Sequence, residues 1–185
     1  MQDQLRRHIE KIVPLTDEEF AFIWKHFTYK KYLKHQFLIQ EGEAVKYNYF
    51  VLSGLLKLVY TDDTTKQHIV SFAMEDWWEN DFYAYYTQTN ATMSLICLED
   101  TQVLCLSLQD YKSLCAMVPK MQRFFLEKAN FGFIGAQRRI ISWLTSDAKA
   151  RYEQLLKQSP SLVQRVPKSQ LAAYLGVSRE TLSRF

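Results

Sequence analysis

The spacing of apolar and polar positions changes twice along this chain of 185 residues. Residues 2–12 have helical spacing, and Thr16 with Glu19 three positions later forms a capping box that predicts a second helix to about His26. Residues 37–106 contain short strand-like runs between polar turns, which is typical of an antiparallel sandwich or barrel. The runs are 37–39, 47–53, 55–60, 68–73, 93–98 and 102–106, with a tight hairpin expected at Glu99–Asp100.

Helical spacing returns after Gln109. Pro119 ends a short helix and is well placed as the first residue of the next one. That second helix is predicted to continue to about Thr145, because no strong helix breaker interrupts it. Apolar or small residues recur on it every three or four positions, which forms one stripe: Val118, Met121, Phe125, Ala129, Gly132, Ala136, Ile140 and Trp143.

The same helix carries a second apolar set beside this stripe, namely Phe124, Phe131, Ile134, Ile141 and Leu144. One side can cover the β region, and we interpret the other as the interface of a parallel homodimer. The candidate dimer residues are Met121, Phe125, Gly132 and Ala136. The alternative is a helix that is buried entirely within one subunit.

The last segment of the chain fits a helix-turn-helix unit. After a helix over 147–158 and a break at 159–161, Ala172 supplies the small residue that two crossing helices need. Gly176, four residues later, suits a turn with positive φ. Ser169 and Ser178 are expected to be the N-caps of the two helices. The inward-facing apolar positions are Leu171, Leu175, Val177, Leu182 and Phe185.

Charge and side-chain chemistry indicate DNA as the partner of this unit. Residues 138–185 hold 9 Lys or Arg and 3 Asp or Glu, whereas residues 1–137 hold 14 and 17. Arginine pairs with guanine and glutamate accepts from cytosine, so we expect the outward residues of the second helix to read bases: Arg179, Glu180, Ser183 and Arg184. Phosphate contacts are expected at Lys168, Ser169 and Ser178. The alternatives are a solvated basic surface and a Glu180 that only stabilises its own helix N-terminus.

This order of parts, with Val-Ser-Arg-Glu-Thr-Leu-Ser-Arg at 177–184 and Glu41-Gly42-Glu43 in an early turn, resembles the Crp/Fnr family of bacterial transcription regulators. The resemblance implies a cyclic-nucleotide-binding β-roll, a dimerisation helix and promoter binding. Arg179, Glu180 and Arg184 match the family's base-reading Arg, Glu and Arg. RNA polymerase is a candidate further partner. The chain stops about two turns into the second helix, so we expect a winged-type unit that is cut short.

The ligand motif of that family is altered in this chain. Cyclic-nucleotide binders carry Gly-Glu and, about a dozen residues later, Arg-Ser or Arg-Thr, whereas here the matching stretches are 79–81 and 91–93. No Lys or Arg occurs between Lys66 and Lys112, so a cyclic phosphate would lack a cationic partner. We therefore expect an unknown effector instead of cAMP or cGMP. Asp81, Tyr85 and Thr92 are the candidate pocket residues; the alternative is that the aromatic stretch 77–86 only fills the core.

The remaining features favour a cytoplasmic binding protein without a cofactor. The 3 cysteines have no C-x-x-C spacing, no signal peptide or membrane span is recognisable, and no metal site is expected. A cupin-like enzyme is an alternative, but no H-x-H cluster or nucleophile–base pair supports it. A sensing or dimerisation module without DNA binding is another. We predict an α+β fold with N-terminal helices and a jelly-roll-like antiparallel β-roll (1–118), a dimerisation helix (119–145) and a helix-turn-helix (146–185).

Overall fold

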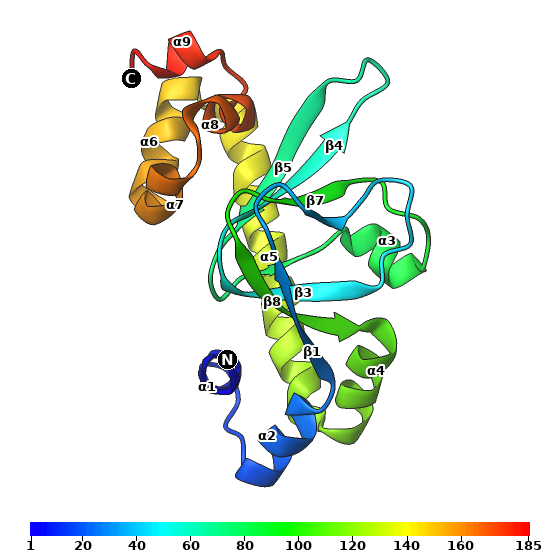
Figure 1. The fold of residues 1–185 in the computed structure, drawn as a ribbon. Coiled ribbons are helices and arrows are strands. Elements are labelled where there is room, and N and C mark those ends of the chain that lie inside the picture. Colours follow the sequence, from blue (N-terminus) through cyan, green and yellow to red (C-terminus); the bar gives the residue numbers. More distant parts are fainter.

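The computed structural model describes residues 1–185 and has an α+β fold, as predicted. Eight antiparallel strands form a β-roll of two four-stranded sheets with the orders β1-β8-β3-β6 and β2-β7-β4-β5 (Figure 1). The strands are β1 (Phe27–Tyr32), β2 (Phe37–Ile39), β3 (Tyr47–Ser53), β4 (Leu56–Thr61), β5 (Gln67–Ala73), β6 (Trp78–Glu79), β7 (Ser94–Cys97) and β8 (Thr101–Ser107). The apolar residues of strands β3, β4, β7 and β8 are almost all buried, because the two sheets face each other.

The expected hairpin at Glu99–Asp100 is wrong. Strand β7 pairs with β4, as in Leu56 opposite Cys97, while β8 pairs with β3 in the other sheet. The turn therefore crosses between the two sheets, because each strand finds its hydrogen-bonding partner in a different layer. Strands β1 and β6 were not predicted, since β1 is rich in lysine and β6 has only two residues.

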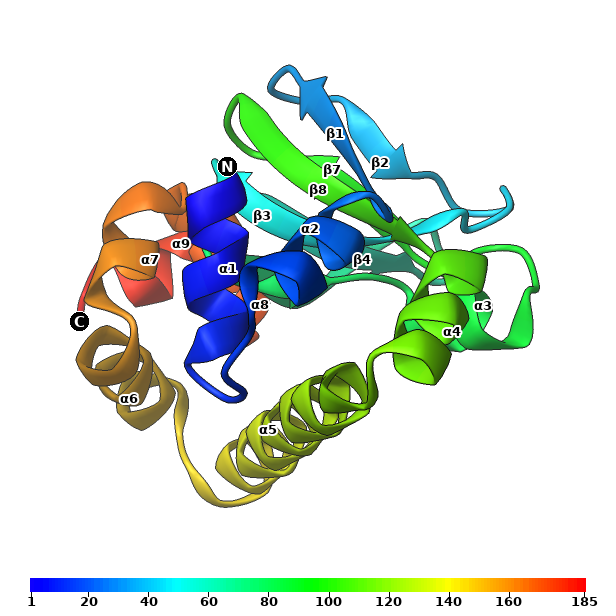
Figure 2. The same cartoon turned by 90° about the horizontal axis from the view of Figure 1, so that it is seen from below.

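Helices α1 (Gln2–Glu10), α2 (Asp17–Trp24) and α4 (Leu108–Met117) pack at one end of the roll (Figure 2). The predicted capping box is present: the Thr16 hydroxyl accepts from the Glu19 amide at 3.2 Å, and the Glu19 carboxylate accepts from the Thr16 amide at 2.9 Å. A short helix, α3 (Phe82–Thr87), lies within the aromatic stretch and was not predicted. Its N-cap is Asp81, whose carboxylate accepts from the Ala84 amide.

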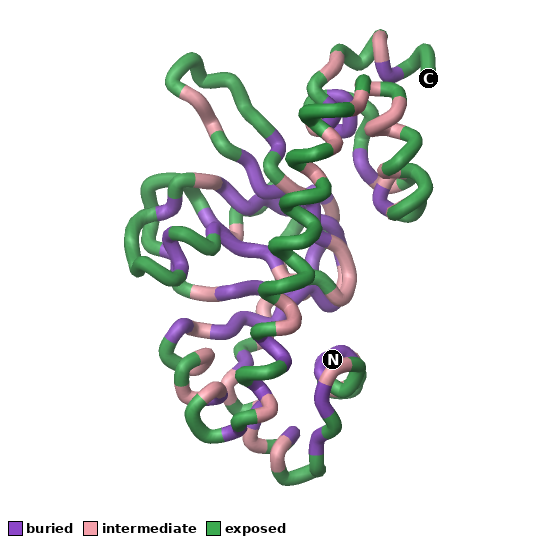
Figure 3. The backbone as a smooth tube through the Cα atoms, turned by 180° about the vertical axis from the view of Figure 1, so that it is seen from behind, coloured by how far each residue is buried: buried purple, intermediate pink, exposed green.

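Helix α5 (Pro119–Thr145) has the predicted bounds and begins with proline. Only its first turns are buried, through Met121, Phe124 and Phe125, which join the apolar core with α1 and β3. The rest of the helix is mainly exposed (Figure 3). Even so, it carries many large apolar side chains.

Four helices complete the chain: α6 (Ala148–Gln158), α7 (Pro160–Arg165), α8 (Lys168–Leu175) and α9 (Arg179–Leu182). Helix α7 begins at the predicted break, because proline is tolerated as the first residue of a new helix. These helices form one group beside the β4–β5 hairpin (Figure 1). Apolar residues of α7 and α8 share a buried cluster with residues of β4, β5 and the end of β7.

Candidate functional site

Helices α8 and α9 meet at a turn that has the geometry expected from the sequence. Gly176 has φ of 72°, in the left-handed region, and ends α8. Ser178 is the N-cap of α9, and its hydroxyl accepts from the Thr181 amide at 3.1 Å. The predicted inward residues Leu171, Leu175 and Leu182 are buried, as is Ala172 where the helices cross. These contacts hold the two helices as one unit.

Two details of the prediction for this unit are wrong. The N-cap of α8 is Pro167 and not Ser169, because the Pro167 carbonyl already accepts from the Gln170 and Leu171 amides. Phe185 does not face inward but is 40% exposed beyond the end of α9, where its ring lies 6.1 Å from that of Tyr152.

The four residues expected to read bases are exposed on one side of α9 and just beyond it: Arg179, Glu180, Ser183 and Arg184. Lys168, Ser169 and Ser178 are exposed as well. Hydrogen bonding to its own amide and to the Ser178 side chain lowers the pKa of Glu180, so this carboxylate is charged at neutral pH. The surface can therefore offer both guanidinium donors and a carboxylate acceptor to a partner.

Three arginines of the basic segment are used inside the molecule. Arg139 donates to the Ile69 carbonyl, Arg151 donates to the Ser146 and Leu175 carbonyls, and Arg165 pairs with two glutamates. The remaining cations are exposed: Arg138, Lys149, Lys157, Lys168, Arg179 and Arg184. The surface of the segment is therefore less basic than its composition indicates.

Next to the turn, Trp143 of α5 lies against Gly176. A Cβ at position 176 would be 2.8 Å from Cζ3 of this ring and closer still to Cη2. The Arg151 guanidinium covers the ring at 4.4 Å from its centroid. The helical spacing places Trp143 in an apolar stripe, and nothing in this spacing indicates a contact with the turn.

The candidate effector residues bond to groups within the protein. Asp81 and Tyr85 are fully buried, and Asp81 Oδ2 accepts from the Thr92 amide at 2.7 Å and from the Thr92 hydroxyl at 2.9 Å. The same oxygen also accepts from the Met93 amide. The Tyr85 hydroxyl donates to the Leu106 carbonyl. Asp81 and Thr92 are thus bonded to each other beside β7, and Tyr85 lies in the core, so these side chains fill the region themselves.

The neighbouring residues Glu79 and Asn80 are also buried. Burial raises the pKa of Glu79 to about 7, against the hydrogen bonds that it accepts from Ser71 and from the Asn80 amide. Neither polar atom of the Asn80 side chain has a protein partner. Of the aromatic stretch 77–86, Trp78 and Tyr85 fill the core, whereas Phe82, Tyr83 and Tyr86 are exposed on α3.

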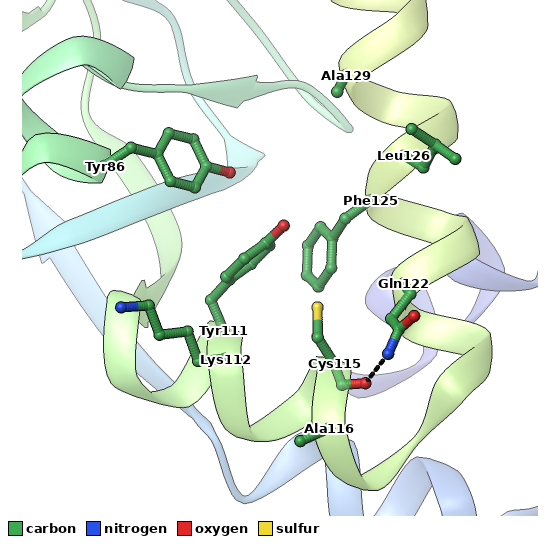
Figure 4. Close-up of a pocket in the computed structure, with 9 residues that line it drawn as sticks. All are labelled: Tyr86, Tyr111, Lys112, Cys115, Ala116, Gln122, Phe125, Leu126 and Ala129. Atoms are coloured by element: carbon green, nitrogen blue, oxygen red, sulfur yellow. Dashed lines mark hydrogen bonds between the residues drawn. The ribbon is translucent and has the colours of Figure 1, made fainter.

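An apolar cavity of about 520 Å³ lies where α3, α4 and α5 meet (Figure 4). The Tyr86 and Tyr111 hydroxyls reach toward it from one side, and Phe125 and Leu126 of α5 form the other. Below them, Gln122 donates to the Cys115 carbonyl at 2.6 Å. The cavity is open to solvent, and burial raises the pKa of the Cys115 thiol, which keeps it protonated.

The candidate dimer residues fall into two groups. Met121 and Phe125 are buried within the protomer, which corrects their assignment to an interface, because the first turns of α5 pack on α1, α4 and the roll. Gly132 and Ala136 are exposed. The large apolar side chains exposed along the same helix are Leu126, Phe131, Phe133, Ile134, Ile140, Ile141, Trp143 and Leu144.

The structure contains no group of three or more His, Cys, Asp or Glu side chains that could hold a metal ion. None of its helices has both the length and the apolar character of a membrane span.

Comparison with known proteins shows which family the β-roll is similar to. Residues 29–117 match the family described as "Cyclic nucleotide-binding domain". These residues run from within β1 through β8 to the end of α4 and include α3, so the β-roll is similar to domains of this family. No curated protein sequence is similar enough to the chain to count as a match.

Solved structures extend the likeness of fold beyond this domain. FixK2 from Bradyrhizobium japonicum is 16% identical with a TM-score of 0.74, over 85% of this chain and 81% of that one. CLP from Xanthomonas campestris is described as a c-di-GMP responsive global regulator. It is 15% identical with a TM-score of 0.72, over 91% of this chain and 89% of that one. The catabolite activator protein from Thermus thermophilus is 21% identical with a TM-score of 0.60, over 92% of this chain and 81% of that one. The chain therefore has the fold of Crp-like proteins, from the β-roll through the long helix.

Proposed function

We propose that this protein is a DNA-binding transcription regulator of the Crp/Fnr type that acts as a homodimer. The observation that carries the proposal is the unit of α8 and α9, whose inner face is packed and whose outer face exposes Arg179, Glu180 and Arg184. In DNA-binding proteins with this unit, the second helix enters the major groove. The three fold neighbours support the proposal, since two are described as an activator protein and a global regulator.

The exposed part of α5 supports the homodimer. A helix of 27 residues spans roughly 40 Å, and most of its length beyond Phe125 shows apolar side chains to solvent. Large exposed apolar patches mark interaction sites. A second copy of the same helix is the partner that we propose, because it presents the same stripe. Two recognition helices would then read a pseudo-palindrome with half-sites one or more duplex turns apart.

The proposed regulator is not controlled by cAMP. In the domain, Asp81 is committed to backbone amides, and the stretch from Lys66 to Lys112 contains no cation for a cyclic phosphate. An unknown small molecule and RNA polymerase remain proposed partners. The proposal includes no enzymatic step, no cofactor and no membrane contact.

The test is selection of genomic DNA fragments with the intact protein, with and without cell extract, followed by affinity measurements on the enriched sequence. Arg179→Ala should weaken binding by about 1–3 kcal/mol and relax the choice at one G·C pair. Lys157→Ala removes an exposed positive charge on α6 and serves as the matched control. Equal losses on specific and random DNA would refute the role of Arg179. If no palindrome is enriched in either condition, the second candidate function, a sensing or dimerisation module without DNA binding, is the better one.

A further inference from the structure

One arginine connects the helix-turn-helix unit to the β-roll with all of its guanidinium nitrogens. Arg165, the last residue of α7, donates from Nη1 to Glu75 Oε2 at 2.7 Å and from Nη2 to Glu99 Oε2 at 2.7 Å. Nε donates to Glu99 Oε1 at 3.1 Å, and Nη2 also reaches Glu75 Oε1 at 3.1 Å and the Gly54 carbonyl at 2.9 Å. We call this set of contacts the Arg165 clamp.

The clamp gathers three separate connections of the β-roll. Gly54 lies between β3 and β4, Glu75 follows β5, and Glu99 lies between β7 and β8. The Gly54 amide donates to the Glu75 carboxylate at 2.8 Å, so one carboxylate bonds both to the roll and to Arg165. Two carboxylates accept from one nitrogen, Nη2, and like charges this close repel unless a cation lies between them. The proximity of the two glutamates is therefore explained by Arg165.

The other contacts between the two parts are mainly apolar. Leu171 and Leu175 of α8 lie in an apolar cluster with Phe72 of β5, and the Phe72 and Tyr174 rings are 5.0 Å apart. Lys57 of β4 donates to the Gln170 side chain at 3.0 Å. Hydrophobic contact is non-directional, whereas a guanidinium fork on two carboxylates fixes both distance and angle.

We propose that Arg165 is a positioning residue, which sets the orientation of the helix-turn-helix unit on the β-roll and thereby the spacing of the half-sites that the dimer accepts. This inference rests on the proposed function. Only Ser146 and Asp147 separate α5 from α6, and Arg151 holds this link to α8 through the Ser146 and Leu175 carbonyls. The clamp adds the charged contact that joins the same group of helices to the β-roll. In a dimer held by α5, each unit that is fixed on its own roll places its recognition helix at one defined distance from the other.

The experiment compares the intact protein with Arg165→Gln, with the double variant Glu75→Gln/Glu99→Gln, and with Lys157→Gln as control. Lys157 is exposed on α6 and loses the same charge without touching the clamp. Arg165→Gln removes the cation of the clamp, and Glu75→Gln/Glu99→Gln removes its two anions. An effect that both variants show is therefore not caused by a folding defect of only one of them. Binding is measured on operators whose two half-sites are moved apart in single base-pair steps, and on a single half-site.

We expect the preference for the best spacing over its neighbours to fall about tenfold in both clamp variants. Affinity for a single half-site should change less than twofold, because the reading face is untouched, and Lys157→Gln should keep the preference. If Arg165 only stabilised the fold, the clamp variants would bind all operators more weakly by the same factor. An unchanged spacing preference in both variants would overturn the proposal.

A measurement without DNA separates this inference from the proposed function. Hydrogen exchange of residues 161–175 and of the segment around Gly54 should become several-fold faster in both clamp variants, while exchange in β3 and β8 stays unchanged. Faster exchange would support the positioning role even if no operator is found, in which case only the proposed function fails. Unchanged exchange in residues 161–175 would overturn the positioning role whatever the DNA result.

Discussion

The contact between Gly176 and Trp143 allows two physical effects to be separated in one position. Gly176→Ala places a Cβ on a residue with φ of 72°, which costs roughly 1–2 kcal/mol in the left-handed region. It also forces that Cβ against the Trp143 ring, 2.8 Å from Cζ3, in a site where Arg151 covers the ring. Trp143 is 44% exposed, so its ring can shift, and moving a side chain off its preferred rotamer costs about 0.5–1.5 kcal/mol. We expect Gly176→Ala to reduce the free energy of unfolding by about 1.5–3.5 kcal/mol.

Two further variants divide this loss into its parts. Asparagine tolerates positive φ, so Gly176→Asn keeps the collision and loses most of the backbone cost. Trp143→Leu removes the ring, so Gly176→Ala in that background should cost only the backbone part, roughly 1–2 kcal/mol. The free energies come from urea unfolding followed by far-UV circular dichroism, combined as a double-mutant cycle. If Gly176→Ala costs less than about 0.5 kcal/mol, or costs the same with and without the ring, the reasoning is refuted.

Three other expectations concern buried carboxylates and the long helix. Burial raises the pKa of Glu79 from 4.5 to about 7, so the folded state holds its proton more tightly and loses stability as pH rises between these values. The free energy of unfolding of Glu79→Gln, relative to that of the wild type, should therefore rise by up to about 3 kcal/mol from pH 5 to pH 7.5 in urea unfolding. A difference between the two proteins that does not vary with pH would contradict this. Asp81→Ala leaves the Ala84, Thr92 and Met93 amides without their acceptor and should cost about 2–4 kcal/mol; an unchanged unfolding midpoint would contradict the structural role. Ile140→Asp places a charge on the exposed stripe and should weaken self-association at least about tenfold in sedimentation equilibrium, whereas Gln137→Asp, exposed on the same helix, should have a smaller effect.

His8 also makes the stability of the protein depend on pH, so the Glu79 experiment compares two proteins that both contain it. Its ring is buried and accepts from the Trp78 indole N–H at 3.2 Å, and burial lowers its pKa to about 4. The folded state therefore gains stability from this group as pH rises from about 4 to about 6.5, which opposes the effect of Glu79. Both proteins carry His8, so its contribution cancels when Glu79→Gln is compared with the wild type.

Local signals were sufficient wherever a short stretch of chain decides its own conformation. The capping box at Thr16, the proline that opens α5 and the glycine at 176 act through bonds or dihedrals within a few residues. Helical spacing likewise predicted the bounds of α5, since the period depends only on neighbouring turns. The exposed side chains of α9 followed from the same rule.

Side-chain roles that depend on distant parts of the chain could not be predicted in this way. Nothing in the sequence near Asp81 shows that its carboxylate meets the amides of Thr92 and Met93 across a loop. The stripe on α5 correctly contained Met121 and Phe125, but spacing cannot distinguish a face that meets α1 from one that meets a second molecule. Both cases bury the same kind of side chain.

Most of the helices and strands, the turn between α8 and α9 and the outward set of Arg179, Glu180 and Arg184 were thus encoded in local patterns, because hydrogen bonding and periodicity act over short stretches of chain. The pairing of β7 and β8 with different sheets, the burial of the Asp81 region and the Arg165 clamp required the folded chain. Each of them joins residues at least 11 positions apart, and their geometry depends on how the two sheets and the last four helices pack together.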